Sequence, residues 1–308
     1  MARILLTGAT GFVGAHCREL LRQQGHHVHA VSSHSPHEPQ PGVTWHQADL
    51  RNPPEARALV SRVRPERLLH LAWITDHGRY WTAPENHNWL AGSVALVEEF
   101  LRHGGRRIVT AGTCAEYDWT QPGPYAEHSS TDRPATVYGQ CKQQLRQQQE
   151  TLAARTGLSQ AWGRIFSPYG PGEFPQRFIP SVITSLLRGE PARISSGRQL
   201  RDFLHVADVA GALVALLHSP VVGPVNIASG EGVPLADVAQ RLARRLHLEH
   251  LLQVGALPDR PGEPDCLVAN VTRLREEVGF VPLCSLDEGL ARTTDWWARH
   301  LSETPSPR

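Results

Sequence analysis

The chain has 308 residues, of which 40% are hydrophobic and 20% charged, and its formal net charge is +1. This composition is typical of globular proteins, and so small a net charge gives no reason to expect a nucleic-acid or acidic-membrane partner. We find no apolar run of membrane-spanning length and no signal peptide, so we expect a cytoplasmic protein. The five cysteines form no CxxC pair and are interpreted as free thiols, and the scattered histidines as solvated surface, with no metal site.

Apolar runs typical of strands alternate with amphipathic segments typical of helices in the first half of the chain. Strands are predicted at 3–8, 27–33, 43–50, 67–73, 106–112 and 160–166. Helices are predicted at 12–25, 53–63, 93–105 and about 135–157. This alternation predicts a Rossmann-type α/β fold, in which helices cover both faces of a doubly wound parallel sheet.

The second half of the chain is less regular. Residues 167–178 are rich in Gly and Pro and predict a loop, and the last residues, 302–308, are predicted to be disordered. Helices are predicted at 180–189 and 207–219, and a strand at 224–229. We expect a dinucleotide-binding domain at 1–166 that also takes in about 198–228. The rest of 167–308 should form mainly a smaller mixed α/β lobe for the substrate.

Gly8, Gly11 and Gly14 form a GxxGxxG pattern between the first strand and the first helix. Glycines allow a tight turn and a close approach of the backbone to a pyrophosphate, and the helix N-terminus offers free N–H groups. The position of the pattern, directly after the first strand, indicates a dinucleotide site rather than merely a tight turn. Asp49 and Leu50, after the third strand, are expected beside the adenine.

The second strand ends in Ser32 and Ser33, where an NAD site usually has a carboxylate for the ribose 2′-hydroxyl. Two hydroxyls without a carboxylate can bind a 2′-phosphate instead. This favours NADP(H) as the cofactor. NAD(H) remains the alternative, because no arginine stands in this stretch to pair with a phosphate.

Lys142 is the only lysine among the 31 Lys and Arg residues. It follows Tyr138 by four positions on a predicted helix, so the two side chains share one face. A nearby ammonium is expected to lower the phenol pKa from its usual value of about 10. The compact ammonium can also reach ribose hydroxyls that the planar guanidinium of arginine serves poorly. The pair therefore predicts an acid/base tyrosine and a lysine that arginine cannot replace.

Three segments, TGATGFVG at 7–14, AGTCAEY at 111–117 and YGQCK at 138–142, together resemble the extended short-chain dehydrogenase/reductase superfamily. The resemblance is greatest to its branch of nucleotide-sugar epimerases, dehydratases and ketoreductases. IFSPYGPGE, RQLRDFLHVADV and RPGEP extend it over nearly the whole chain.

The resemblance implies a role for each matching residue. Thr113 would bind the reacting oxygen, and Tyr138 would be the general acid/base with Lys142 as its partner. Arg201 and Arg260 would bind the diphosphate of a nucleotide-sugar substrate, the alternative being a solvated surface position for either. A homodimer, formed through a helix pair that includes the Tyr138 helix, is also implied. The expected cofactor contacts are Gly8, Gly11, Phe12, Val13, Gly14, Ser32, Ser33, Asp49, Leu50, Leu71, Ala72, Tyr138 and Lys142.

Departures from the family pattern narrow the chemistry. Dehydratases of the family carry Asp-Glu directly after the threonine, where this chain has Cys114 and Ala115, so we exclude water elimination. Relatives that invert carbons beside the keto group place a cysteine at the position of Ala115. Cys114 is one residue off and is interpreted as a small packed thiol. Ser167 stands where many relatives have Asn near the diphosphate.

We therefore predict NADP(H)-dependent reduction of the 4-keto group of a nucleotide-activated 6-deoxyhexose. An NAD-dependent nucleotide-sugar C4 epimerase is the first alternative. A non-catalytic dinucleotide-binding redox sensor is the second, and the intact Thr, Tyr and Lys argue against it. Trp73, Tyr80 and Trp81, in the aromatic segment after the fourth strand, either wall the substrate or nicotinamide pocket or pack a loop.

Overall fold

Seven strands form one parallel sheet within residues 2–34 and 38–303, which the computed structural model describes. The order across the sheet is β10-β6-β5-β4-β1-β2-β3, and each neighbouring pair is parallel. The predicted Rossmann-type fold is therefore confirmed. The strands are β1 Arg3–Thr7, β2 His27–Ser32, β3 Val43–Gln47, β4 Arg67–His70, β5 Arg107–Thr113, β6 Ser159–Ile165 and β10 Gly223–Ile227.

Helices cover both faces of this sheet. Ile4 and Leu6 of β1 pack in one buried cluster with α1 and α6, whereas Leu5 packs in another with α2 and α3. This division follows from the strand geometry, because successive side chains point to opposite faces. On the second face α4 packs beside α3. The helices are α1 Phe12–Gln23, α2 Pro53–Val63, α3 Glu85–Arg102, α4 Val137–Thr156 and α6 Val206–His218.

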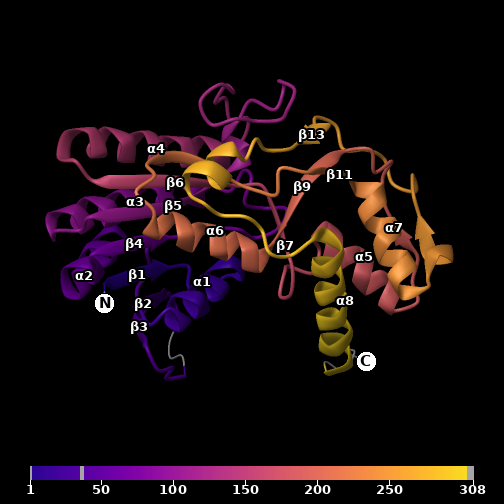
Figure 1. Ribbon diagram of the computed structural model, residues 1–308, viewed down its shortest axis with the longest axis horizontal. Helices are drawn as coiled ribbons and strands as arrows, with labels where there is room; N and C mark the ends of the chain where they lie inside the picture. Colours follow the sequence, from indigo (N-terminus) through magenta and orange to yellow (C-terminus); the bar gives the residue numbers. More distant parts are fainter. Residues whose placement is uncertain (1, 35–37, 304–308) are drawn as a thin grey trace.

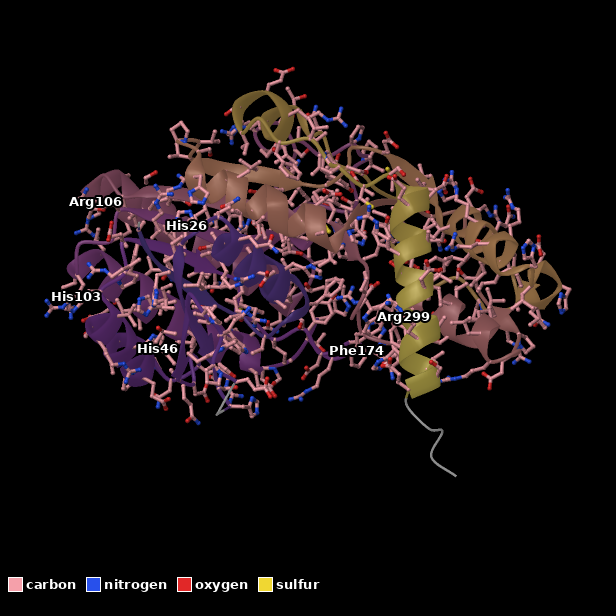
Figure 2. The ribbon with its side chains drawn as sticks, turned by 60° about the horizontal axis from the view of Figure 1, so that its bottom comes forward. His26, His46, His103, Arg106, Phe174 and Arg299 are labelled. Atoms are coloured by element: carbon pink, nitrogen blue, oxygen red, sulfur yellow. The ribbon has the colours of Figure 1, made fainter. Side chains whose placement is uncertain are left out.

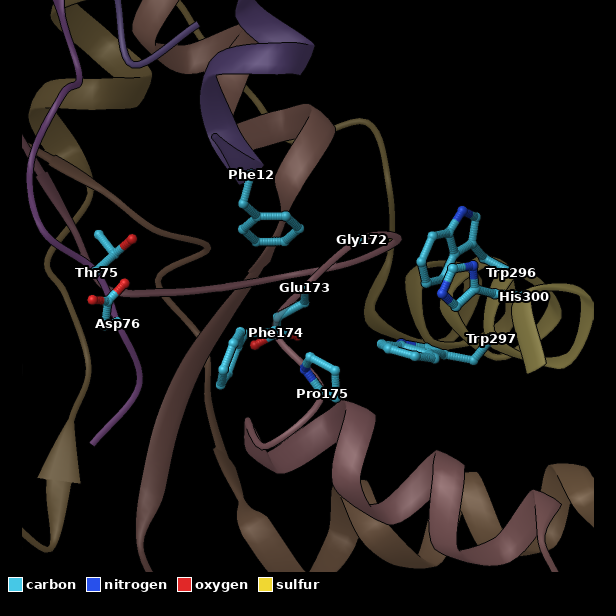
Figure 3. Close-up of a pocket in the computed structure, with 10 residues that line it drawn as sticks. All are labelled: Phe12, Thr75, Asp76, Gly172, Glu173, Phe174, Pro175, Trp296, Trp297 and His300. Carbon is cyan, nitrogen blue, oxygen red and sulfur yellow. The ribbon is translucent and has the colours of Figure 1, made fainter. Parts of the chain in front are cut away.

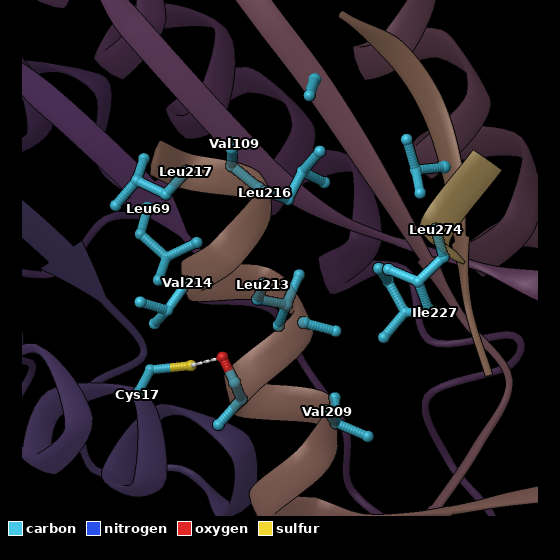
Figure 4. Close-up of a cluster of buried hydrophobic side chains, with 14 of the residues drawn as sticks. Cys17, Leu69, Val109, Val209, Leu213, Val214, Leu216, Leu217, Ile227 and Leu274 are labelled. Carbon is cyan, nitrogen blue, oxygen red and sulfur yellow. Dashed lines mark hydrogen bonds between the residues drawn. The ribbon is translucent and has the colours of Figure 1, made fainter. Parts of the chain in front are cut away.

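The first cluster is built around α6, as Figure 4 shows. Val209, Leu213 and Leu217 of this helix are buried with Leu69 and Val109 of the sheet. Cys17 of α1 lies in the same cluster, where its Sγ–H donates to the carbonyl oxygen of Ala210 at 4.0 Å. All five cysteines are free, so no disulfide links α1 to α6.

The predicted smaller lobe of mixed strands is confirmed and lies beside the large sheet (Figure 1). Its central strand, β9, pairs in parallel with β7 and β13 and antiparallel with β11. Helices α5, α7 and α8 enclose a separate buried cluster there. The elements are β7 Ser167–Tyr169, α5 Phe178–Leu187, β8 Ala192–Arg193, β9 Leu200–His205, β11 Gly232–Pro234, α7 Leu235–Leu246, β12 Leu252–Gln253, β13 Cys266–Leu267 and α8 Leu286–Glu303. Short helical turns lie at Cys114–Glu116, Glu249–Leu251 and Arg273–Glu277.

The structure differs from the sequence prediction at several elements. Ser167–Tyr169, predicted as loop, forms a strand because it pairs with β9. Helix α3 begins at Glu85 rather than at 93. Helix α8 extends to Glu303, so residues 302 and 303 are helical; the remainder of the predicted disordered tail is outside the described residues. Residues 198–228 are divided between the two parts of the structure. Strand β10 belongs to the large sheet and α6 packs on it, whereas β9 belongs to the small sheet. The domain boundaries stay a prediction.

Two carboxylates tie the smaller lobe to the large sheet. Asp208 on α6 accepts hydrogen bonds from the backbone N–H groups of Leu283 and Cys284 at 3.0 Å each, just before α8 begins. Asp202 on β9 accepts from the N–H of Gly230 at 3.0 Å. Figure 2 shows Phe174 between the large α/β lobe and α8. No helix among the described residues is both long enough and apolar enough to span a membrane.

Candidate active site

The turn between β1 and α1 has no room for a side chain at Gly8, nor has the first turn of α1 at Gly14. Gly8 has a φ of +68°, and a Cβ there would lie 2.8 Å from the backbone nitrogen of Ala72. A Cβ on Gly14 would lie 1.9 Å from the carbonyl oxygen of Gly8. The Gly11 N–H closes the turn by donating to the same oxygen at 3.0 Å. Helix α1 then starts at Phe12 without a side-chain cap, which leaves the N–H groups of its first turn available to an anion.

Thr7 holds the segment after β4 against this turn. Its Oγ1 accepts from the N–H groups of Leu71 and Ala72 at 3.1 Å each, and lies 2.7 Å from Nδ1 of His70. Burial lowers the pKa of His70 to about 3, with the Lys142 ammonium acting in the same direction, so this imidazole is neutral. The structure thus places Leu71 and Ala72 directly beside Gly8, at the edge where parallel strands end.

Ser32 and Ser33 lie at the carboxyl end of β2. Ser32 is buried, and its Oγ accepts from the backbone N–H of His34 at 3.1 Å. Ser33 is exposed, and its Oγ lies 3.1 Å from Nδ1 of His34. One hydroxyl is therefore used in the local turn, while the other faces solvent next to an imidazole.

Asp49 and Leu50 follow β3 and lie on the same edge of the sheet. The Arg51 guanidinium binds both carboxylate oxygens of Asp49, with N···O distances between 2.7 and 3.2 Å, and holds the pKa of this carboxyl below its usual range. Leu50 lies under α3, where a Cβ on Gly92 would be 1.8 Å from its carbonyl oxygen. Helix α3 therefore sets the position of this segment.

Thr113 ends β5 and caps the short helical turn that follows. Its Oγ1 accepts from the N–H of Ala115 at 3.2 Å, and its own N–H donates to the carboxylate of Glu116 at 2.9 Å. A hydroxyl has one donor and two acceptor positions. With one acceptor position occupied by Ala115, the hydroxyl keeps its O–H donor and its second acceptor position for the neighbouring Tyr138 phenol and a reacting oxygen.

Tyr138 lies in the first turn of α4, close to Thr113. Thr136 caps this helix, and a Cβ on Gly139 would lie 2.4 Å from the carbonyl oxygen of Ala115, so α4 packs directly on the segment after Thr113. Burial raises the pKa of Tyr138, and the Thr113 hydroxyl acts in the opposite direction.

Tyr80 and Trp81, from the aromatic segment after β4, pack against this tyrosine. Both rings stand edge-on to the ring of Tyr138, with centroid distances of 5.0 and 5.9 Å. The backbone of Trp81 also accepts the Tyr138 N–H at 3.2 Å.

Lys142 is 2% exposed and turns toward the sheet. Its Nζ donates to the carbonyl oxygen of Ala111 at 3.0 Å and lies 3.9 Å from the centre of the Trp73 ring. Burial lowers its pKa to about 7, and Glu116 opposes that shift. We expected the ammonium to lower the pKa of Tyr138. That direction is wrong for this structure, because burial of the phenol dominates.

The two arginines predicted to bind the substrate differ in their surroundings. Arg201, on β9, is buried and its guanidinium pairs with Glu263 at 2.7 Å. Arg260 is exposed in the loop before β13. Burial lowers the pKa of His77, and the positive charges of Arg177 and Arg260 lower it further. A phosphate at Arg201 would have to replace the carboxylate of Glu263.

Arg177 was not identified from the sequence. It precedes α5, and its guanidinium lies 5.8 Å from the centre of the Tyr80 ring, which itself packs on Tyr138. Its place at the end of the Gly- and Pro-rich loop 167–178, just before a predicted helix, was the signal available. Arg177 and Arg260 both act on His77, so the two cations lie in the same region of the molecule.

A cavity of about 360 Å³ opens between the start of α1 and the smaller lobe (Figure 3). Phe12, Glu173 and Phe174 line it on one side, and Trp296 and Trp297 of α8 line it on the other. Burial raises the pKa of Glu173 to about 8. Phe12, which we predicted to contact the cofactor, lines this cavity and is not packed in a core.

A model of the NAD dependent epimerase/dehydratase family matches residues 4–228, which include the Gly-rich turn, Thr113, Tyr138 and Lys142. The chain belongs to this family. It is an NAD(P)-dependent oxidoreductase of the extended short-chain dehydrogenase/reductase type, as its motifs indicate, so the alternative of a non-catalytic sensor is not retained.

Named relatives in the family are similar over nearly the whole chain. UDP-glucose 4-epimerase of Streptomyces lividans is 27% identical over 323 residues, covering 97% of this chain and 96% of the relative. UDP-glucuronate 4-epimerase 4 of Arabidopsis thaliana is 25% identical, covering 97% of this chain and 76% of the relative. The solved structure of MoeE5 with UDP-glucuronic acid and NAD is 29% identical, with a TM-score of 0.84 and coverage of 97% and 100%.

Proposed function

We propose that this enzyme uses NADP(H) to reduce the 4-keto group of a nucleotide-activated 6-deoxyhexose. The observation that carries the proposal is the half-buried phenol of Tyr138, which packs against Tyr80 and Trp81 beside the hydroxyl of Thr113. Burial keeps this phenol protonated at neutral pH, and the reduction of a ketone needs a proton donor.

The bound nicotinamide would supply the hydride to the carbonyl carbon. Thr113 donates its O–H to the carbonyl oxygen and polarises it. Tyr138 then gives its proton to that oxygen as the alcohol forms, and the resulting phenolate regains a proton from water. Lys142, placed by Ala111 and Trp73, would bind the hydroxyls of the nicotinamide ribose.

The cofactor would lie along the carboxyl edge of the sheet. Its pyrophosphate fits the uncapped start of α1, between the Gly-rich turn and Leu71–Ala72. The adenine fits beside Asp49 and Leu50, and a 2′-phosphate fits the exposed hydroxyl of Ser33. We further propose that Arg260 and Arg177 hold the substrate diphosphate, with Arg201 as a third contact once Glu263 is displaced.

A C4 epimerase that uses NAD is the second candidate. Two of the relatives carry that activity in their names, and the MoeE5 structure contains NAD. An epimerase oxidises C4 and then reduces it from the other face, so it regenerates its cofactor in each cycle. Thr113, Tyr138 and Lys142 suffice for both reactions, and cofactor use therefore separates them.

The purified enzyme should oxidise one NADPH for each 4-keto-6-deoxyhexose nucleotide that it converts. It should also purify largely free of nicotinamide, because a site without a ribose carboxylate lacks a charge-assisted bond of about 1.5–3 kcal/mol to NAD. Absorbance at 340 nm and product analysis over a panel of keto-sugar nucleotides measure this. Tightly bound NAD, together with interconversion of two C4 epimers without added cofactor, would establish the epimerase instead.

Ser33→Asp should shift the cofactor preference toward NADH. The new carboxylate would repel a 2′-phosphate and accept from a 2′-hydroxyl, and the exposed position of Ser33 makes the change tolerable for folding. The ratio of kcat/KM for NADPH and NADH, measured for both proteins, reports the shift. Gln253→Glu, at an exposed position of β12 in the smaller lobe, serves as a control for added charge. A wild-type enzyme that already prefers NADH would contradict the prediction.

We also propose that the enzyme is a homodimer. The outer faces of α3 and α4 form a groove of about 360 Å³, lined by apolar and amide side chains that include Val94, Val97, Gln148 and Leu152. The α4 helix of a second copy would cover this groove. Light scattering of the purified protein distinguishes a dimer of 34.0 kDa subunits from a monomer.

A further inference from the structure

Glu116 lies beneath the catalytic end of β5 and is fully buried. Its Oε1 accepts from the N–H of Thr113 at 2.9 Å and from Nε1 of Trp162 at 2.8 Å. Its Oε2 accepts from Nε of Arg164 at 3.3 Å and pairs with Arg146 at the same distance. A buried carboxylate is retained only where such donors surround it. One of these donors is the backbone of a predicted catalytic residue.

The charges around Glu116 do not cancel among themselves. Arg164 and Arg146 also share Asp132, at 2.7 and 2.6 Å, and Arg146 binds Glu150 at 2.6 Å. Two guanidinium groups thus face three carboxylates in this cluster, which leaves one negative charge over. A positive charge nearby would complete the balance.

Lys142 is the nearby cation, because its Nζ binds the carbonyl oxygen of Ala111, and at the next residue, Gly112, a Cβ would lie 2.8 Å from Oε1 of Glu116. The titratable groups around its ammonium are Glu116 on the turn after β5, His70 on β4 and Tyr138 one helical turn away. His70 is neutral, and the phenol of Tyr138 is protonated. Among these groups Glu116 is the carboxylate that favours the charged form of Lys142 against burial.

We propose that Glu116 is a positioning residue for both catalytic groups. It fixes the backbone of Thr113, so that the hydroxyl keeps its proton directed to the substrate, and it is the counter-charge of the Lys142 ammonium. The inference rests on the proposed function only in taking Thr113 and Lys142 as catalytic. Glu116 acts through them and does not touch the substrate.

The single lysine of the chain allows a direct test. Protein labelled with ¹³C at lysine Cε has one side-chain lysine signal, so Lys142 can be titrated without assignment and without substrate. Glu116→Gln keeps the shape and the carbonyl acceptor but removes the charge. We expect the titration of Lys142 to move to lower pH by about one unit or more, the size of the effect of a neighbouring opposite charge. The pH dependence of NADPH oxidation should move in the same direction.

Asp132→Asn is the matched control. It removes a carboxylate from the same two arginines but not from Thr113, so it should destabilise the fold similarly and shift the lysine titration much less. Arg146→Gln removes a cation 3.3 Å from Glu116 and should move the titration upward, which keeps the test valid if Glu116→Gln fails to fold.

The two proposals fail in different ways. An unchanged titration in Glu116→Gln, equal shifts in Glu116→Gln and Asp132→Asn, or a downward shift in Arg146→Gln would overturn the role of Glu116. Failure of the wild-type protein to reduce any 4-keto nucleotide sugar would overturn the proposed function and leave the lysine titration as it is.

Discussion

Replacing Tyr138 by phenylalanine should lower turnover by roughly 10²- to 10⁴-fold, the usual contribution of a positioned general acid. The ring contacts with Tyr80 and Trp81 do not need the hydroxyl, so the fold and the binding of NADPH should be retained. Steady-state rates together with fluorescence titration of NADPH measure the two effects separately.

Tyr125→Phe is the matched control for this change. Tyr125 is buried, and its hydroxyl donates to the carbonyl oxygen of Gln121 at 2.9 Å. Loss of that bond should reduce stability by about 1 kcal/mol and leave turnover within a few fold. If Tyr138→Phe were as active as Tyr125→Phe, Tyr138 would not be the proton donor.

Lys142→Arg should lower turnover by about 10²-fold or more although the charge is kept. The ammonium lies between the carbonyl oxygen of Ala111 and the face of Trp73, and a guanidinium is too broad for that space. A displaced cation near the reacting centre costs this much even when the displacement is about 1 Å.

The reverse exchange at the surface, Arg155→Lys on α4, controls for the two side chains as such. It should leave the rate unchanged. A near-normal rate in Lys142→Arg would remove the physical reason for a single lysine in a chain that otherwise uses arginine. Circular dichroism and thermal unfolding of each variant show whether the lost rate comes from lost structure.

The large sheet was predictable because its signals are local. Short apolar runs such as 3–8 and 106–112 fold as strands, and the amphipathic segments between them fold as the covering helices. The smaller lobe was predictable only in outline. Ser167–Tyr169 is extended because β9, more than thirty residues later, offers it a hydrogen-bonding edge, and no pattern within the segment reveals that partner.

The candidate site shows the same contrast. Thr113, Tyr138 and Lys142 stand in motifs whose spacing is fixed by one strand end and one helix. Glu116 stood beside them in the sequence but gave no signal, because its partners Trp162 and Arg164 come from β6. The rise in the pKa of Tyr138 was missed for a similar reason. Tyr80 and Trp81, which pack on this phenol, come from the segment after β4.

Because the chain returns to the large sheet after the smaller lobe, not every fragment of the protein can fold and stay soluble. After β6 the chain enters the smaller lobe, and α6 and β10 then come back to cover one face and close one edge of the sheet. A fragment that stops at residue 166 would lack both, so the apolar side of α1 and the edge of β6 would be left open to other chains. Such a fragment should accumulate in inclusion bodies. A soluble minimal unit would instead need residues 206–228 joined to it by a designed linker.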